Sequence, residues 1–580
     1  MSKTDDLSAR WARIMNRLEA RRAAWTRPAT AFISQPEPRT IGSFARGRQL
    51  SAGNFVFAGT LIQAPHTRLW DLAAPDVEFS AEQHGFGWLD DLAAAGDAPA
   101  RQAAQTWLSD WIDHYGDGTG PGWTPELTGR RLIRWITHAL FLLSGQGSEN
   151  SEKFMRSLAQ QTIFLSRRWK SSAPGLPRFE ALTGMLYAGL SLEGMEDNVA
   201  PALTALAREC DTQIGPEGGL PTRNPEDLLD VFTLLTWAAL ALSETGHSPS
   251  SAHWGAIERI APTLRTLRHA DGGLARFHGG GRGLEGRLDA ALATSGVKSS
   301  APDGLSMGFV RLSAGRTSVI IDAATPPRGR ASSNAHASTL AFELTSGRRP
   351  LIVNCGSGAS FGPDWRRAGR ATPSHSTLIL AGRSSSRLGA SGESRQWLDD
   401  TPTDVPVEIS QAQDGIRFEG GHDGYKRRYG LTHIRKLDLS FEGRGIAGED
   451  TLMTLDDQDR TIFDAALDQS RLQGVPYDIR FHLHPDVDAS VDMGGSAVSL
   501  ALKSGEIWIF RLDGATKMSV EASVYLEKLR LKPRATKQIV LSGSVMQYAS
   551  RVRWSLSKAQ DTPISIRDLA TDEVDPLAVD

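Results

Sequence analysis

The spacing of apolar residues changes once along this chain, near residue 300, and that change constrains the fold more than any other feature of the sequence. Before it, apolar side chains recur three and four residues apart, as on one face of a helix. After it, short apolar runs alternate with a period of two, which is typical of strands. The stretch TSGVKSSAPDG, residues 294–304, is small, polar and punctuated by Gly and Pro, so we expect the domain boundary there.

The first part, residues 1–295, predicts an all-α domain. In RQAAQTWLSDWIDHY, the residues Trp107, Leu108, Trp111 and Ile112 form one buried stripe, and GRRLIRWITHALFLLS repeats the pattern. Further segments of this kind follow, separated by Gly, Pro and Asn and with no strand pattern between them. Helix hairpins packed into a layer satisfy such a series.

The second part, residues 305–580, predicts antiparallel sheets packed face to face. Its short runs are β-branched or alternating and are joined by Gly-rich turns; examples are TSVIIDAATPP, STLAFELTSG, PLIVNCGSG and EIWIFRLDG. The whole chain is therefore expected to be an α+β multidomain protein.

Composition excludes several classes of protein. The 580 residues are 40% hydrophobic and 23% charged with a net charge of −3, as in an ordinary soluble globular protein, and no basic field points to nucleic acid. Cys210 and Cys355 cannot form a disulfide framework or a CxxC zinc site. We expect no transmembrane segment, because no apolar run approaches about 20 residues. No secretion signal is visible, so the sequence alone favours the cytoplasm. The N-terminus reads as a basic amphipathic surface helix, with a membrane-surface anchor as the alternative.

Three stretches of the second part carry histidines in a recognisable order. These are AHASTLAFELTSGRRPLIVNCGSG, then RATPSHSTLIL, then GYKRRYGLTHIRKLDLSFEGRGIAGEDTL. Together with RFEALTGMLYAGL and EGGLPTRNPEDLLDVF in the helical part, they resemble the motifs of the heparinase II/III group of polysaccharide lyases. The resemblance runs from about residue 100 to about residue 530 and is more specific in the second part.

This resemblance implies a fold and a reaction. The implied fold is an N-terminal (α/α) toroid of helix hairpins followed by a large antiparallel β-sandwich, with a substrate cleft between them. The implied reaction is β-elimination at a uronic acid, in which a base takes the C5 proton, donors neutralise the carboxylate and an acid protonates the leaving oxygen. The implied partner is an anionic polysaccharide, and family members commonly act in the cell envelope or periplasm. The oligomeric state stays open.

The family's catalytic positions are replaced in this chain. Leu176 and Pro177 stand at its Asn-His motif, and Asp227 stands where its tyrosine is expected. Asn334 stands at the first histidine of the His-x-His-x-Asp motif and Ser338 at its aspartate. Since none of these side chains supplies the expected Tyr/His pair, we weigh a divergent lyase against a non-catalytic glycan-binding or scaffolding protein. A third reading, a metal-dependent hydrolase, lacks a carboxylate ligand nearby in the sequence.

If elimination survives, His336 is the expected base, with Asn334 and Asn224 as neutral donors. The residues expected to contact an acidic substrate are Arg223, Arg366, Arg370, His433 and Arg435. Each assignment has a structural alternative. Asn224 and the Pro-Glu-Asp that follows make a well-formed helix start, the Arg366–Arg370 stretch suits a solvated loop, and His433 and Arg435 share one strand face.

Some family members hold a structural zinc ion, and the matching positions here are His336, Asn354 and His375. Two imidazoles are retained, but an amide replaces the carboxylate and is a far poorer zinc ligand. We therefore expect no tightly bound zinc and no certain cofactor, and we expect His336 to belong to a polar cluster inherited from a metal-bearing site.

Overall fold

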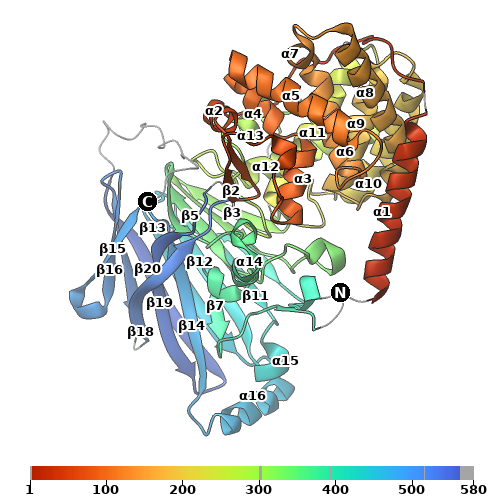
Figure 1. Ribbon diagram of the computed structural model, residues 1–580. Helices are drawn as coiled ribbons and strands as arrows, with labels where there is room; N and C mark the ends of the chain where they lie inside the picture. Colours follow the sequence, from red (N-terminus) through yellow and green to blue (C-terminus); the bar gives the residue numbers. More distant parts are fainter. Residues whose placement is uncertain are drawn as a thin grey trace. The chain divides into compact units, whose positions relative to one another are not determined.

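A computed structural model describes residues 3–25, 27–299, 304–390, 395–514, 516–528 and 530–561 of the chain. They form two compact units. The first comprises Met1–Leu220, Asp227–Ala261 and Asp289–Ser299, and the second comprises Pro221–Glu226, Pro262–Leu288 and Ser300–Asp580. Figure 1 draws the helical segments in red to yellow and the strands of the second unit in green to blue.

The first unit is built almost entirely from helices. They are α1 (Lys3–Ala23), α2 (Phe44–Ser51), α3 (Val77–Gly85), α4 (Trp88–Ala95), α5 (Ala98–Tyr115), α6 (Pro125–Thr137), α7 (Ala139–Leu143), α8 (Ser148–Arg168), α9 (Leu176–Ser191), α10 (Val199–Gln213), α11 (Pro225–Glu244), α12 (Ser251–Thr266) and α13 (Arg287–Ser295). A short hairpin, β1 (Asn54–Phe57) and β2 (Thr60–Gln63), lies between α2 and α3 in the sequence.

Several helices begin where the sequence supplies a capping side chain. The Asp76 carboxylate accepts a hydrogen bond from the Phe79 N–H at 2.7 Å, and Asp97 accepts one from the Ala100 N–H at 2.9 Å. Thr124 caps α6 in the same way. These caps satisfy N–H groups that the first turn of a helix leaves without partners.

Helices α6 and α9 cross at a pair of glycines. A Cβ atom on Gly184 would lie 2.4 Å from the Cα of Gly129, so neither position tolerates a side chain without moving the helices. The close approach explains why small residues interrupt two otherwise bulky apolar stripes. It also brings Arg130 of α6 and Glu180 of α9 together as an ion pair.

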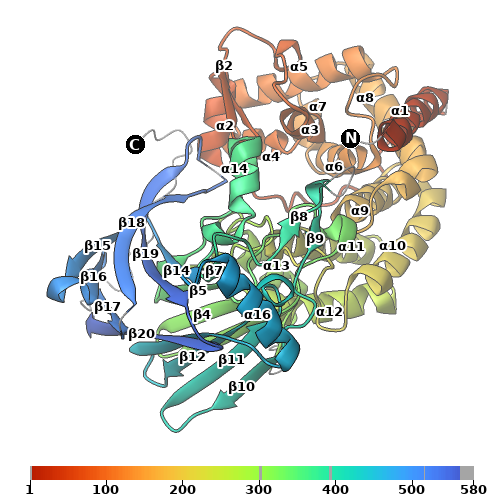
Figure 2. The ribbon, with the colours of Figure 1, turned by 90° about the horizontal axis from the view of Figure 1, so that it is seen from below.

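The described residues of the second unit form two large antiparallel sheets and a two-stranded one, β8 (Arg387–Leu388) with β9 (Leu398–Asp400). One large sheet has the strand order β10-β11-β12-β13-β20-β17-β16-β15, and Figure 2 shows β10, β11 and β12 side by side. The other large sheet has the order β18-β19-β14-β6-β5-β4-β3, with β7 also paired to β14. The bounds of the strands are β3 (Phe309–Ala314), β4 (Thr317–Asp322), β5 (Phe342–Ser346), β6 (Arg349–Val353), β7 (Leu378–Leu380), β10 (Val407–Gln411), β11 (Gly415–His422), β12 (Thr432–Ser440), β13 (Gly445–Met453), β14 (Val475–Leu483), β15 (Val487–Asp492), β16 (Ala497–Leu502), β17 (Ile507–Asp513), β18 (Lys517–Tyr525), β19 (Arg534–Val545) and β20 (Ala549–Gln560).

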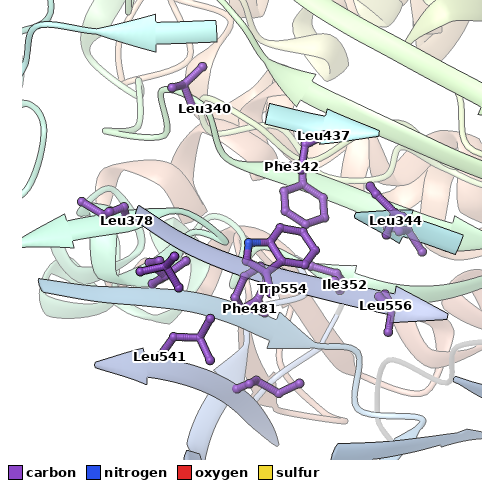
Figure 3. Packing of buried hydrophobic residues seen from close by; sticks show 14 of the residues in the cluster. Leu340, Phe342, Leu344, Ile352, Leu378, Leu437, Phe481, Leu541, Trp554 and Leu556 are labelled. Atoms are coloured by element: carbon purple, nitrogen blue, oxygen red, sulfur yellow. The ribbon is translucent and has the colours of Figure 1, made fainter. Parts of the chain in front are cut away.

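The core of the second unit is centred on one tryptophan. Trp554 of β20 stacks on Phe342 of β5, with ring centroids 6.1 Å apart and planes 4° apart, and packs edge-on against Phe481 of β14 (Figure 3). Gly448 of β13 lies opposite Trp554, and a Cβ atom there would come within 2.1 Å of the indole ring. Side chains from both sheets thus bury the tryptophan, as face-to-face packing requires.

The predicted fold class is confirmed: a helical region is followed by an antiparallel, sheet-rich region. The residues around the expected boundary include 300–303, which lie outside the described residues. Two segments from the helical part of the sequence, Pro221–Glu226 and Pro262–Leu288, belong to the second unit, because their polar side chains pair with its strands. Among the described residues, no helix is both long and apolar enough to span a bilayer.

Candidate functional site

Three histidines that are far apart in the sequence meet inside the second unit. His336 Nδ1 lies 3.0 Å from His375 Nε2, and His336 Nε2 accepts a hydrogen bond from the Gly279 N–H at 3.0 Å. The backbone N–H of His336 donates to His278 Nδ1 at 3.1 Å. The structure therefore brings together His336 and His375, which the sequence analysis paired, and adds His278 from the Gly-rich loop that follows α12.

The hydrogen bonds of this chain fix the protons on the rings. His375 Nδ1 lies 2.9 Å from the Ala371 carbonyl oxygen and must donate to it, so His375 Nε2 accepts. His336 Nδ1 then donates to His375, and its Nε2 lone pair is taken by the Gly279 amide. His336 is 1% exposed and has no lone pair left for a substrate proton.

Burial keeps both imidazoles uncharged. It lowers the pKa of His336 well below the ordinary value, and the neighbouring His375, His278 and Arg370 lower it further. Burial also lowers the pKa of His375 to about 4. At neutral pH the cluster is a string of neutral hydrogen-bonded rings.

Arg223 forms a buried ion pair beside these rings. Its Nη2 lies 2.6 Å from Asp322 Oδ1, and its guanidinium carbon lies 4.7 Å from the centre of the Phe309 ring. The other N–H groups donate to the carbonyls of Met307, Gly308, Ala324 and Thr325 at 2.7 to 3.2 Å. Arg223 also has a left-handed backbone with a φ of 50°, a strained conformation that these bonds hold in place.

Asp322 is the anion of this cluster. Burial alone would raise its pKa, but Arg223 and then His278 hold the pKa well below its usual range. Ser338, at the position of the family's motif aspartate, donates to Asp322 Oδ2 at 2.6 Å. The sequence analysis did not single out Asp322 or His278, because both become conspicuous only through partners distant in the chain.

The two asparagines expected as neutral donors have local partners. Asn224 Oδ1 accepts a hydrogen bond from the Glu226 N–H at 2.9 Å at the start of α11, as a helix cap does. Asn334 is exposed, and its Oδ1 accepts a hydrogen bond from Arg366 at 2.9 Å.

Arg370 follows α14 (Pro363–Gly369), and its guanidinium is hydrogen-bonded to the backbone of the segment that carries His336. It donates to the carbonyls of Ala335 at 2.8 Å and Ser332 at 2.7 Å, and it is 7% exposed. Burial and the nearby Arg366 lower its pKa to about 10. Arg370 thus fixes the segment that holds His336, and Arg366 contacts the same segment through Asn334.

His433 and Arg435 lie in a second buried cluster. Both point from β12 at Asp450 of β13: His433 Nε2 and Arg435 Nε each lie 2.8 Å from Asp450 Oδ1. Trp554 donates to the other carboxylate oxygen at 3.0 Å, and His422 Nε2 lies 3.2 Å from His433 Nδ1. His433 and Arg435 have no exposed surface. The cluster links neighbouring strands of one sheet, and Arg435 also donates to the carbonyls of Leu340 and Ser376, each at 2.8 Å.

The three positions that bind zinc in some family members are two histidines and an asparagine in this chain, so an anionic ligand is missing. Asn354 Oδ1 accepts a hydrogen bond from the Ser376 N–H at 2.9 Å, and the facing nitrogens of His336 and His375 bond to each other. Within the described part of the chain, no group of three or more His, Cys, Asp or Glu side chains is suited to a metal ion.

The positions of the first unit that align with the family's acid–base residues have acidic surroundings. Leu176 and Pro177 open α9, and one turn later Glu180 accepts a hydrogen bond from Arg130 at 2.5 Å. Burial raises the pKa of Glu180; Arg130 opposes this, whereas Asp230 and Glu126 raise it further. Three carboxylates thus surround one guanidinium. The sequence analysis missed this environment, because it considered only the aligned residues Leu176, Pro177 and Asp227.

Comparisons with known proteins agree with this architecture. The family model described as "Heparinase II/III-like, C-terminal" matches residues 297–555. FtsZ-localized protein C of Caulobacter vibrioides is 31% identical over 555 residues, which cover 93% of this chain and 92% of that protein.

Solved lyases share the fold at low sequence identity. The crystal structure of heparinase III superimposes with a TM-score of 0.67 at 13% identity, covering 93% of this chain and 88% of that one. A mutant of the heparan sulfate lyase HepC from Pedobacter heparinus gives a TM-score of 0.58 at 14% identity, covering 95% of this chain and 89% of that one.

Proposed function

Because this chain belongs to the heparinase II/III-like family, we propose that it uses the family's fold for binding rather than for β-elimination, as a component of the bacterial division site. The observation that carries the proposal is the state of His336, which is buried with both ring nitrogens engaged. The relative that matches nearly the full length at 31% identity is named for its localisation with FtsZ, which supports a role in division.

Elimination needs a base within hydrogen-bond reach of the substrate's C5 proton. His336 would have to break two hydrogen bonds and become exposed to reach one. The aligned positions in the first unit hold Leu176, Pro177 and Asp227, none of which replaces a Tyr/His pair. Loss of a general acid or base costs about 10²–10⁴-fold in rate, and here both are replaced.

Neutralisation of a uronate carboxylate needs free cationic donors. The Arg223 guanidinium already donates hydrogen bonds to Asp322 and to four carbonyls, and Arg370 already donates to two carbonyls. Around Glu180, one turn after Leu176, three acids, Glu126, Glu180 and Asp230, outnumber Arg130. Arg178, which lies closer to Leu176, already donates to Glu209 and to the Ser172 carbonyl. These charges disfavour a polyanionic substrate at the aligned positions.

We expect no lyase activity. Elimination creates a C4–C5 unsaturated uronate that absorbs ultraviolet light, so the protein should be incubated with heparan-type, alginate-type and glucuronan-type polymers and the absorbance followed. The trace should match that of heat-denatured protein, while the heparan sulfate lyase HepC from Pedobacter heparinus, as the positive control, should give a rising signal on heparan sulfate. Product formation that disappears in a folded His336→Ala variant would overturn the non-catalytic proposal.

We expect binding to FtsZ. The purified chain should pellet with GTP-assembled FtsZ polymers and stay in the supernatant when GDP prevents assembly. A folded bystander protein such as serum albumin, which should stay in the supernatant in both cases, measures trapping. Equal amounts of the chain in the pellet with and without polymers would remove division-site binding from the proposal and leave the absence of elimination to stand or fall on the absorbance assay.

A second candidate is binding of an acidic glycan without cleavage. It is favoured by α14, where Arg367 is exposed and Arg366 is partly exposed beside Asn334. Such binding should weaken as salt rises, because exposed charges are screened within about 8 Å at physiological ionic strength. A glycan array showing no preference for acidic over neutral oligosaccharides eliminates it.

A further inference from the structure

Helix α1 has an apolar face that its own unit leaves exposed. Trp11 is 65% exposed, Ile14 57% and Leu18 41%, and their spacing puts them on one side of the helix. The opposite side packs on α8: the Arg168 Nε donates to Asn16 at 2.8 Å, and Gln160 donates to the Ala20 carbonyl at 3.0 Å. The side chains of the exposed stripe are therefore not the ones that attach α1 to α8.

The helix is basic. It has six basic residues, Lys3, Arg10, Arg13, Arg17, Arg21 and Arg22, against three acids, Asp5, Asp6 and Glu19. Glu19 is already paired with Arg22 at 2.9 Å and with Arg167 at 3.5 Å. A partner for α1 must therefore offer apolar contact surrounded by negative charge.

The second unit has a surface with that chemistry, which we call the α16 patch. It consists of α16 (Asp457–Gln469) with Leu455, Leu472, Met546 and Tyr548, which are 56%, 60%, 51% and 45% exposed. The Thr454 N–H donates to the Tyr548 carbonyl at 2.9 Å, and the Tyr548 hydroxyl donates to Asp464 at 3.1 Å. A Cβ atom on Gly474 would lie 2.5 Å from the Met546 sulfur, so Met546 adjoins the loop that carries Leu472.

Leu472 is held outward by an unfavourable backbone. Arg471 and Leu472 both have positive φ, 53° and 60°, a region that non-glycine residues rarely occupy. The Leu472 N–H donates to the Leu467 carbonyl at 3.0 Å, which fixes the loop at the end of α16. Strain of this kind at an exposed apolar residue is typical of binding surfaces.

The α16 patch is acidic. Helix α16 contains four aspartates, Asp457, Asp459, Asp464 and Asp468, and Asp456 caps it. Lys426 pairs with Asp456 and Asp459, Arg460 pairs with Asp457, and Arg471 follows the helix, so the excess negative charge lies at Asp464 and Asp468. Asp457 and Asp468 are exposed, and Asp459 is buried. Apolar side chains flanked by acids complement the apolar, basic face of α1 in both respects.

We propose that the exposed face of α1 in one copy of the chain docks on the α16 patch of a second copy. Since each copy presents both surfaces, the contact is heterologous and extends head to tail. The few side chains involved bury much less than the about 1,600 Å² of a standard interface, so we expect a dissociation constant of about 1–100 µM. An anionic bilayer would also suit α1, but the complementary patch on the same chain favours self-association.

Two variants separate the surfaces without touching the core. Ile14→Ser/Leu18→Ser removes the α1 stripe, and Leu472→Gly/Met546→Ser removes the apolar part of the α16 patch while relieving the strained leucine. All four side chains are more than 40% exposed, so the fold should persist, which circular dichroism checks. Val77→Ser, at a residue 79% exposed, is the matched control.

Sedimentation velocity should show a mass that rises with concentration for the wild type and for Val77→Ser. Each double variant alone should associate at least about tenfold more weakly. An equimolar mixture of the two should form one-to-one complexes and stop there, because one intact α1 face and one intact α16 patch remain per pair. The test uses no FtsZ and no glycan, so its outcome is independent of the proposed function.

The proposal is overturned by a wild type that stays monomeric, by variants that associate like the wild type, or by a mixture that fails to pair. Binding of the monomeric chain to phosphatidylglycerol vesicles that is lost in Ile14→Ser/Leu18→Ser would assign the α1 face to the membrane instead.

Discussion

The protein is expected to lose stability steeply as the pH falls from 6.5 toward 4, because it buries several histidines in the neutral form. Burial lowers the pKa of His375 from 6.5 to about 4, and that of His84 and His482 to about 3. The unfolded chain takes up these protons near pH 6.5, whereas the folded chain does not. Stability is therefore full above pH 6.5 and falls as the pH drops toward the folded-state values.

The expected slope is large. Each such histidine contributes about 1.4 kcal/mol per pH unit in this window, so these three give about 4 kcal/mol per unit. A protein is typically stable by about 5–15 kcal/mol, so unfolding near pH 5 is expected. Burial raises the pKa of Asp91 and Glu180, and these two carboxyls oppose the trend, but they are fewer than the buried histidines.

Urea unfolding measured at several pH values checks this slope. His482, whose ring nitrogens lie 2.7 Å from the Ser523 hydroxyl and 2.9 Å from the Pro373 carbonyl, is a suitable probe. His482→Gln should flatten the slope by about 1.4 kcal/mol per pH unit. His66→Gln is the matched control, since His66 is exposed and should leave the slope unchanged. A stability that is flat between pH 7 and pH 5 contradicts the neutral buried histidines.

Asp450→Asn is expected to destabilise the protein by about 3–5 kcal/mol, because it leaves the buried Arg435 guanidinium without its counter-ion. Burial opposes ionisation of Asp450, but Arg435 and then His433 hold its pKa well below the usual range. The asparagine amide would also face the Trp554 N–H with a donor where the carboxylate accepts at 3.0 Å.

The matched control is Asp438→Asn on the neighbouring strand, β12. Asp438 pairs with Arg417 at 2.7 Å, but the two side chains are 38% and 47% exposed, and exposed pairs contribute about 1 kcal/mol or less. Chemical denaturation followed by circular dichroism compares the two variants. Equal losses of stability would mean that water reaches the Asp450 cluster, and would contradict the buried ion pair between Asp450 and Arg435.

The architecture could be predicted from the sequence, because the period of apolar residues is a local property of the chain. The change of period near residue 300 separates helices from strands, and the run Asn224-Pro225-Glu226 predicts the helix start at which Asn224 caps α11. The family motifs paired His336 with His375, and the rings lie 3.0 Å apart. Each of these features depends on neighbours in the chain or on motif order.

Only the tertiary structure decided what the polar side chains do. Arg223 was expected to meet an anion because it precedes a helix start, and Arg370 because it belongs to an arginine-rich stretch. In the structure Arg223 meets Asp322, 99 residues away, and Arg370 meets carbonyls 35 and 38 residues away. Arg435 and His433 share a strand face, as the period of two predicts, but that face meets the buried Asp450. A single sequence gives residue type and local period. It does not give the strand register and the loop conformations, and these decide whether a charged side chain faces water or is paired inside the protein.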